Sequence, residues 1–172
     1  MVEDIKQFLS NCAKYCRADL HLHSPLSRDW KNNSTKTYQA NTNIDRMSQI
    51  GDISDECLRD FVAFLIEKKL DVVAITDHMR YSFGLRLANY VGKENINLVV
   101  FPGIELNVKI KQSLIQDFRI HVLAIFPPNI GNKIERIFPS NIKDEANRDG
   151  SEEVEYDKID VLIGTFPTFH TF

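Results

Sequence analysis

The chain is poor in cysteine, lacks long apolar runs and has no glycine-rich phosphate loop, and each absence excludes a class of protein. Its 172 residues include three cysteines, an odd number without the spacing of a disulfide framework. No run of about 18 apolar residues could cross a bilayer, and the N-terminus has no apolar signal-peptide core. We therefore expect a cytoplasmic protein with reduced thiols and no membrane partner.

Strong charge of one sign is also missing. The formal net charge is −3 and the pI is near 5.9, which gives no general attraction to nucleic acid. A nucleic-acid substrate is not excluded, because bound metal ions would supply local positive charge. Neither a P-loop nor a dinucleotide-binding fingerprint is present, and the sequence has no internal repeat.

Histidine, by contrast, is concentrated in a few places. Four of the five histidines lie in strand-like apolar runs, and a glutamate follows the Pro-Gly step of another such run. Histidine and carboxylate together are the ligand set of zinc, manganese and iron. The runs are residues 18–24 with His21 and His23, residues 72–78 with Asp77 and His78, residues 101–105 with Glu105, and residues 120–125 with His121.

The spacing of the first pair fits a metal site on a strand. Side chains two residues apart share one face of a strand but not of a helix, so His21 and His23 can converge while Leu20 and Leu22 pack behind them. Glu105 could bridge two divalent ions, which stand about 3.5–4 Å apart in binuclear phosphate-cleaving sites. His78 follows a β-branched run at a strand end, where barrels of strands and helices carry their chemistry.

Each element taken alone has a plainer interpretation. The two-histidine pair could be a surface feature of an edge strand, and Thr76 or Asp77 could cap a helix. Glu105 could be a solvated strand residue, and His121 could be a core histidine bonded to the backbone. The joint occurrence of four elements of one form, in a fixed order, favours metal binding.

That order resembles the PHP family, the polymerase and histidinol phosphatase domain. Residues 20–24 are similar to its first motif, residues 75–78 to its second, residues 102–105 to its third, and His121 to the histidine of the next strand. The family's fold is a distorted barrel of seven strands with two or three metal ions. The resemblance therefore implies an α/β fold, an incomplete PHP-like distorted βα-barrel formed by residues 1–172 as a single domain.

The resemblance also implies a ligand set for divalent ions such as zinc, manganese or iron. His21, His23 and Glu105 would hold the first ion, and Glu105 and His121 would share the second. His78 would bind a third ion or support one of the other ligands without binding an ion itself. Family members often carry a further ligand five or six residues after the second histidine, which makes Asp29 a shifted candidate.

The resemblance covers residues 15 to 127 and then fails. A later strand histidine and a closing Asp-x-His are not present, and a closed βα-barrel takes about 250 residues. We therefore expect a metal cluster that is open on one side, with ligands supplied by further chain or by a partner domain such as an ATPase or polymerase. The alternative is that His170 folds back with Asp157 or Asp160 to close the site.

Periodicity and capping signals predict alternating elements along the chain. Ser54 is a suitable N-cap for the second helix, with acidic residues in its first turn and Lys68 and Lys69 in its last. Residues 105–110 and 118–126 are too close for a helix between them, which predicts a hairpin. We expect helices over residues 3–14, 55–69, 82–91 and 129–138, strands over 15–21, 71–76, 98–101, 105–110, 118–126 and 159–165, a polar loop over 25–51, and an acidic mobile loop or linker over 140–158.

The function expected from these features is metal-dependent hydrolysis of a phosphate ester, with a phosphomonoester, a nucleotide or a nucleic-acid end as substrate. Asp77 would orient a ligand or accept a proton, and His78 would ligate or protonate the leaving oxygen. One alternative is a truncated or degenerate PHP-like module that binds metal or a partner without catalysis. The amidohydrolase class also begins with His-x-His, but the Thr-Asp-His and Gly-Ile-Glu elements fit it less well.

Overall fold

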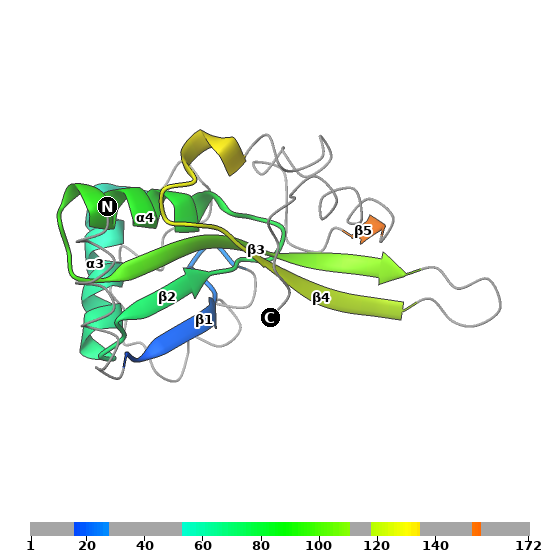
Figure 1. The fold of residues 1–172 in the computed structure, drawn as a ribbon, viewed down its shortest axis with the longest axis horizontal. Helices are drawn as coiled ribbons and strands as arrows, with labels where there is room; N and C mark the ends of the chain where they lie inside the picture. The colour runs from blue at the N-terminus through cyan, green and yellow to red at the C-terminus, as the bar shows by residue number, and fades with distance from the viewer. Residues whose placement is uncertain (1–15, 28–52, 111–117, 135–152, 156–172) are drawn as a thin grey trace, which may run out of the picture.

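The computed structural model describes residues 16–27, 53–110, 118–134 and 153–155, which form a curled mixed sheet with two helices (Figure 1). This mixed α/β arrangement is compatible with an incomplete α/β barrel. The elements in chain order are β1 (Ala18–Leu22), α3 (Asp55–Glu67), β2 (Val72–Ile75), α4 (Ser82–Lys93), β3 (Val99–Ile110), β4 (Phe118–Ile125), the 3₁₀ helix η3 (Gly131–Lys133) and β5 (Val154–Glu155).

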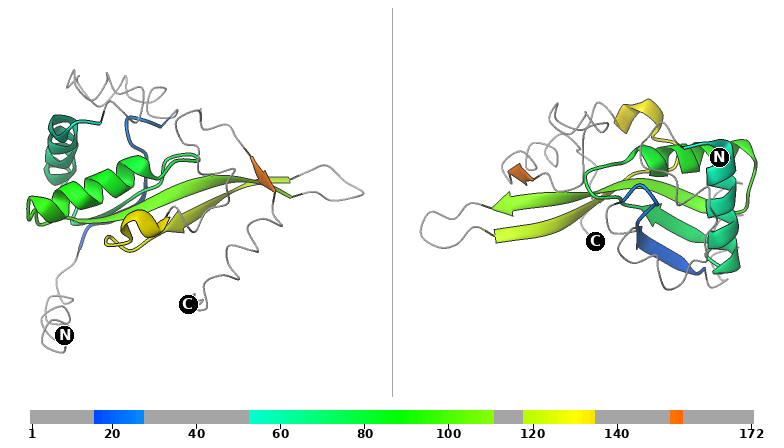
Figure 2. Two further views of the ribbon diagram at one scale, coloured as in Figure 1. Left: turned by 90° about the horizontal axis from the view of Figure 1, so that it is seen from above. Right: turned by 180° about the vertical axis from the view of Figure 1, so that it is seen from behind.

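Strand β3 organises the sheet. The strand order is β1-β2-β3-β4, with β1, β2 and β3 parallel and β4 antiparallel to β3. Strand β5 pairs with Val108 and Lys109 of β3. Because β4 pairs with the same two residues on one edge of β3, β5 lies on the other edge, which β2 occupies nearer the start of β3. Both helices lie on the same side of the sheet, and the β3–β4 ribbon projects beyond them (Figure 2).

Helix α3 begins where the capping signal predicts. The Ser54 side chain accepts a hydrogen bond from the backbone N–H of Cys57 at 3.2 Å. The predicted end at residue 69 is wrong, because the helix stops at Glu67 and Lys69 adopts a left-handed φ of 58°. The Lys69 N–H then bonds to the Ile66 carbonyl and the Leu70 N–H to the Leu65 carbonyl, which is a Schellman ending that turns the chain into β2.

Two apolar clusters hold the elements together. The first joins both helices to β2 and the start of β3, with Phe61 of α3 meeting the ring of Phe83 of α4 edge-on at 5.1 Å. The second lies under the β3–β4 ribbon and includes Ile104, Leu106 and Val108. These even-numbered residues of β3 are buried on the face opposite to Glu105, because successive strand residues point to opposite faces.

The two strands expected over residues 98–101 and 105–110 are one continuous strand. Pro102 pairs with Ile75 of β2 and its carbonyl accepts from Phe126, while Gly103 pairs with Ile125 of β4, so the chain passes from parallel to antiparallel pairing without a break. The expected hairpin with residues 118–126 is confirmed as β3–β4. Of the helix expected over 129–138, the described residues show the 3₁₀ turn η3 and then Ile134 in helical conformation, while residues 135–138 lie outside the described residues.

Other expectations concern residues beyond those that the structure describes. The helix over residues 3–14, most of the loop over 25–51, the acidic segment over 140–158 and the strand over 159–165 lie wholly or mainly outside the described residues. Within the described residues, no helix has both the length and the apolar character needed to span a membrane.

Candidate metal centre

A local irregularity in β1 lies beside His21, and His23 follows directly after the strand. The pairing register with β2 shifts between Asp19 and Leu22, and the Asp19 carboxylate accepts a hydrogen bond from the His21 N–H at 3.1 Å. Such irregularities commonly redirect a side chain beside a functional site. The Nε2 atoms of His21 and His23 approach to 3.2 Å, so the predicted convergence of this pair is confirmed. The expected packing of Leu20 is wrong, because that side chain is exposed, while Leu22 does pack against the core.

Glu105 reaches the cluster from within β3, whereas the sequence predicted that it begins a separate strand over residues 105–110. Its backbone N–H donates to the Asp77 carbonyl at 3.0 Å, and its carbonyl accepts from the Met79 N–H at 2.9 Å. The segment after β2 therefore continues beside β3 as a short parallel bridge between His78 and Glu105. Met79 completes this bridge at a φ of 55°, a left-handed conformation that is uncommon outside glycine.

His121 enters from the neighbouring strand by a diagonal route. In the β3–β4 register it lies opposite Asn107, while Glu105 lies opposite Leu123. Residues two positions apart on the facing strand share a face and lie within reach of a long side chain. The His121 Nδ1 atom accordingly makes a close contact with Glu105 Oε1.

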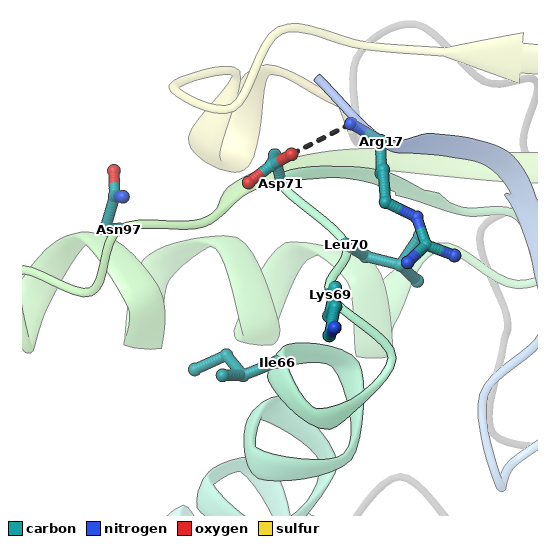
Figure 3. A pocket seen from close by; sticks show the side chains of 6 residues that line it. All are labelled: Arg17, Ile66, Lys69, Leu70, Asp71 and Asn97. Atoms are coloured by element: carbon teal, nitrogen blue, oxygen red, sulfur yellow. Dashed lines mark hydrogen bonds between the residues drawn. The ribbon is translucent and has the colours of Figure 1, made fainter. Parts of the chain in front are cut away.

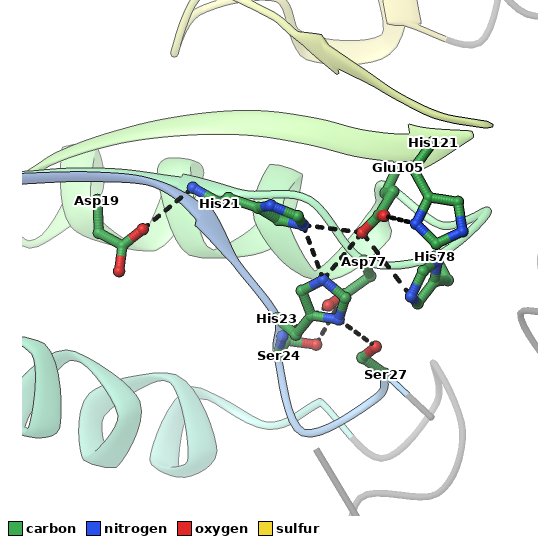
Figure 4. A network of polar contacts seen from close by, with 9 residues as sticks. All are labelled: Asp19, His21, His23, Ser24, Ser27, Asp77, His78, Glu105 and His121. Carbon is green, nitrogen blue, oxygen red and sulfur yellow. Dashed lines mark hydrogen bonds and ion pairs between the residues drawn. The ribbon is translucent and has the colours of Figure 1, made fainter. Parts of the chain in front are cut away.

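Four imidazoles thus surround one carboxylate (Figure 4). Glu105 Oε2 lies 2.9 Å from Nε2 of His21, 3.0 Å from Nε2 of His23 and 3.7 Å from Nε2 of His78. The ring centroids of His78 and His121 are 5.1 Å apart. Two groups of potential ligands share the glutamate, namely His21, His23 and Glu105, and His78, Glu105 and His121.

The donor spacing fits an ion in the first group. Two imidazole nitrogens and Glu105 Oε2 stand 2.9, 3.0 and 3.2 Å apart. Tetrahedral ligands with bonds of roughly 2.0–2.1 Å are separated by about 3.3 Å, so the three atoms have the spacing of a shared coordination sphere. The five residues therefore form a group that could bind a divalent metal ion.

Electrostatics keep the ligands in their binding forms. The Glu105 side chain is 2% exposed, and all the ion pairs that it makes with the described residues involve histidines. Burial acts to raise the pKa of its carboxyl, but the hydrogen bond with His21 and the charges of His78 and His121 outweigh burial, so the pKa is lowered. Burial, reinforced by the nearby His78, also lowers the pKa of His23. Glu105 therefore stays charged and His23 stays neutral, as ligation requires.

This chemistry predicts how metal binding depends on pH. Protons compete with the ion for the imidazole nitrogens, so affinity for manganese should fall from about pH 7.5 to about pH 5.5. Because the pKa values of both His23 and Glu105 are lowered, these two ligands should keep their binding forms longer as the pH falls. Calorimetric titration with manganese at the two pH values would measure the change. An affinity that stays constant would argue against imidazole ligation.

Asp77 supports the cluster from behind. Its side chain is 1% exposed, and its two oxygens accept hydrogen bonds from the N–H and the Oγ–H of Ser24, both at 2.6 Å. The next turn brings Ser27 Oγ within 2.8 Å of His23 Nδ1. Of the two roles expected for Asp77, this geometry favours orientation of ligands over proton transfer. Neither serine was predicted from the sequence, although short hydroxyl residues soon after His-x-His suit such supporting contacts.

Asp77→Asn should therefore weaken metal binding without removing a ligand. The amide nitrogen would face a Ser24 donor in place of an acceptor oxygen, which would loosen the turn that carries His23. We expect manganese affinity to drop by roughly 10- to 100-fold, as for other residues that orient metal ligands. Asp55→Asn on the exposed surface of α3 is the matched control, and its affinity should equal that of the wild type. Equal affinities for both variants would contradict the orienting role.

The remaining candidate ligand and the possible closing residues cannot be placed. Asp29, Asp157, Asp160 and His170 all lie outside the described residues. His21, His23, His78, Glu105 and His121 are brought together as expected.

A cavity lies at the end of β1 and β2 that is opposite to the ligand cluster (Figure 3). Its volume is about 460 Å³. Beside it, the backbone N–H of Arg17 donates a hydrogen bond to the Asp71 carboxylate at 2.8 Å. Arg17 and Asp71 precede β1 and β2, whereas the metal cluster lies where these strands end. In barrels of strands and helices the ends that follow the strands carry the chemistry, so this cavity is not the candidate active site.

No protein-family model matches the chain, and no curated protein sequence matches it either. The geometry of the cluster therefore carries the functional argument.

Proposed function

We propose that this chain is a metal-dependent phosphoesterase built on a PHP-like, incomplete βα-barrel. The observation that carries the proposal is the sharing of Glu105 by two groups of imidazole ligands, since paired divalent ions are the usual arrangement for displacement at phosphorus. The order of the four ligand elements along the chain, which resembles the PHP family, supports the same conclusion.

Each residue has a role that follows from its position. His21, His23 and Glu105 would hold one ion, and His78, Glu105 and His121 would hold a second. Divalent ions held there would polarise phosphoryl oxygens and lower the pKa of a coordinated water toward neutrality.

The cluster is open to solvent on the side where two of its histidines lie. The side chains of His21 and His121 are 49% and 58% exposed, whereas those of His78 and Glu105 are 11% and 2% exposed. A phosphate ester would therefore approach across His21 and His121, and Glu105 would remain beneath the reacting group. The buried side of the cluster is closed by Asp77 and Ser24, which hold the turn after β1 in place.

The described residues offer three ligands to each ion, with Glu105 counted twice. A complete binuclear site needs more, and we propose that further chain or a partner domain, such as an ATPase or polymerase, supplies the rest. This openness also favours the second candidate function, a PHP-like module that binds metal or a partner without catalysis.

One experiment separates the two functions. Elemental analysis of the purified chain would measure its metal content, and p-nitrophenyl phosphate and bis(p-nitrophenyl) phosphate with added manganese would report hydrolysis. We expect bound divalent metal and hydrolysis that a chelator abolishes. Bound metal without hydrolysis would support the non-catalytic module, and protein that binds no metal at all would refute the phosphoesterase and leave only a module that binds a partner.

A further inference from the structure

One edge of β3 is paired by two different strands with a gap between them. Strand β2 pairs with residues 99–102, and β5 pairs with Val108 and Lys109. Between these stretches, the segment that carries the ligand His78 lies beside β3 and forms the bridge between His78 and Glu105. The way in which this segment is held against β3 decides where His78 lies relative to Glu105.

The bridge follows the pattern of a parallel strand pair until it reaches Met79. The Glu105 N–H donates to the Asp77 carbonyl, and the Met79 N–H donates to the Glu105 carbonyl. In a regular parallel pair the next bond would join the Asn107 N–H to the carbonyl of Met79, because the bonds of such a pair are evenly spaced. Met79 instead turns the chain with a φ of 55°, which ends the regular pattern at this residue.

The Met79 side chain takes the place of that carbonyl. Its Sδ atom accepts a hydrogen bond from the Asn107 N–H at 3.4 Å. Met79 is 0% exposed and belongs to the second apolar cluster. Methionine suits this position because its unbranched side chain is flexible and its thioether can accept a weak hydrogen bond. Met79 thus binds β3 twice, through its backbone to Glu105 and through its side chain to Asn107.

This double contact concerns one of the two ligand groups more than the other. His78 directly precedes Met79 and belongs to the group that it forms with Glu105 and His121. Figure 4 shows His78 and His121 together on one side of the Glu105 carboxylate. Glu105 is held independently, because the pairing of β3 with β4 continues on the other edge of the strand. Loss of the Met79 contact should therefore displace His78 first.

We propose that Met79 is a positioning residue for the second ion, because its thioether replaces a backbone carbonyl and so fixes His78 within its ligand group. The proposal rests on the two ion sites of the proposed function and adds a residue that acts through a ligand. The other group is positioned separately, since His21 and His23 depend on β1 and on the turn that Ser24 holds. A change at Met79 should therefore affect the two sites unequally.

The test is Met79→Leu, titrated calorimetrically with manganese beside the wild type. Leucine has a similar volume and no special preference for a left-handed conformation either, so the change mainly removes the sulfur acceptor. We expect affinity for the second ion to fall about tenfold, as when a residue that orients a ligand is changed, and affinity for the first ion to stay within about twofold. Ile134→Leu, at another 0% exposed position of the same cluster, is the control and should leave both affinities unchanged.

A second comparison separates the sulfur from the shape of the side chain. Selenomethionine keeps an acceptor at this position, whereas norleucine replaces the sulfur by a methylene group without adding a branch. We expect the selenomethionine protein to bind manganese like the wild type and the norleucine protein to bind it like Met79→Leu. Because the sequence contains three methionines, norleucine is also introduced into Met79→Leu, where it should change nothing further.

A cycle with His121→Ala tests whether Met79 acts through the second ligand group. His121→Ala removes a ligand from that group alone, so the ion that it loses is the second one. Adding Met79→Leu to His121→Ala should leave the remaining affinity unchanged, because the group on which Met79 acts is already broken.

The outcomes separate the positioning role from the proposed function. Equal weakening of both ions in Met79→Leu, or weakening of the first ion in the double variant, would indicate general loosening of the fold and overturn the role. Wild-type affinities in Met79→Leu or in the norleucine protein would also overturn it. A wild type that binds one ion would overturn the role and leave a site for a single ion, and a wild type that binds none would refute the metal-dependent function as well.

Discussion

Glu105→Gln should abolish metal binding and phosphoester hydrolysis in a protein that remains folded. Both groups of ligands contain this carboxylate, so one substitution removes a ligand from each, together with the negative charge that the four imidazoles share. Glutamine keeps the side-chain volume, which leaves the packing of β3 largely unchanged. We expect manganese affinity and turnover to fall by at least ~100-fold, beyond the loss seen when a residue behind a ligand is changed.

The control for this variant is Glu67→Gln at the end of α3. Its carboxylate is 76% exposed and pairs only loosely with Lys68 at 3.8 Å, so the same charge is removed far from the cluster. Metal content by elemental analysis and far-UV circular dichroism would be measured for both variants. Wild-type turnover in Glu105→Gln would show that the metal interpretation is wrong, and an unfolded variant would show that the carboxylate is structural.

Gly103→Ala should lower the stability of the whole domain. A Cβ atom at this position would stand 2.8 Å from the Thr76 side chain, 3.0 Å from the Ala124 carbonyl and 3.1 Å from the Ile75 carbonyl. The two carbonyls are backbone groups of the adjacent strands β2 and β4, which cannot move without disturbing the sheet. We expect a loss of about 1–3 kcal/mol in the free energy of unfolding, as for other insertions into a packed interior.

Gly92→Ala is the matched substitution with the opposite expected sign. A Cβ atom there meets nothing within 4 Å, and Gly92 lies in the last turn of α4, where alanine loses less conformational freedom on folding. Stability should rise by about 0.5–1 kcal/mol. Denaturant unfolding of both variants would measure the difference. If both variants shifted in the same direction, close packing at Gly103 would not be the cause.

Residue spacing predicted one part of the ligand cluster, because His21 and His23 alternate with apolar residues, which fixed their common direction. The ligand roles of His78 and His121 were implied by the resemblance to the PHP family and not by spacing. The position of Glu105 was not predictable in the same way, because no local signal shows that β3 runs on through Pro102 and Gly103. That continuity depends on pairing with β2 and β4, which lie on opposite edges of β3.

The ends of α3 show the same division between local and tertiary signals. The Ser54 side chain caps the start of α3 through a local hydrogen bond, so the sequence predicts where the helix begins. The stop at Glu67 depends on Lys69 adopting a left-handed conformation that its residue type does not favour, and the turn toward β2 selects it. The supporting serines were missed because Ser24 gains its partner, Asp77, only when β1 and β2 lie side by side.

The long separation of the ligands along the chain has a consequence for folding kinetics. His21 and Glu105 are 84 residues apart, and they meet only after β1 has paired with β2 and β2 with β3. Contacts between distant residues form late, because the entropy of closing the intervening loop must first be overcome. We therefore expect the ligand cluster to form after the transition state for folding, so an added ion would stabilise the finished fold alone.

Stopped-flow refolding and unfolding with and without manganese would show this directly. We expect the ion to slow unfolding and to leave the folding rate nearly unchanged, as for any interaction that forms after the transition state. Faster folding with manganese would instead mean that the ligands meet early. On the expected order of events, the ion binds only after the fold is complete, and its release would be the first step of unfolding.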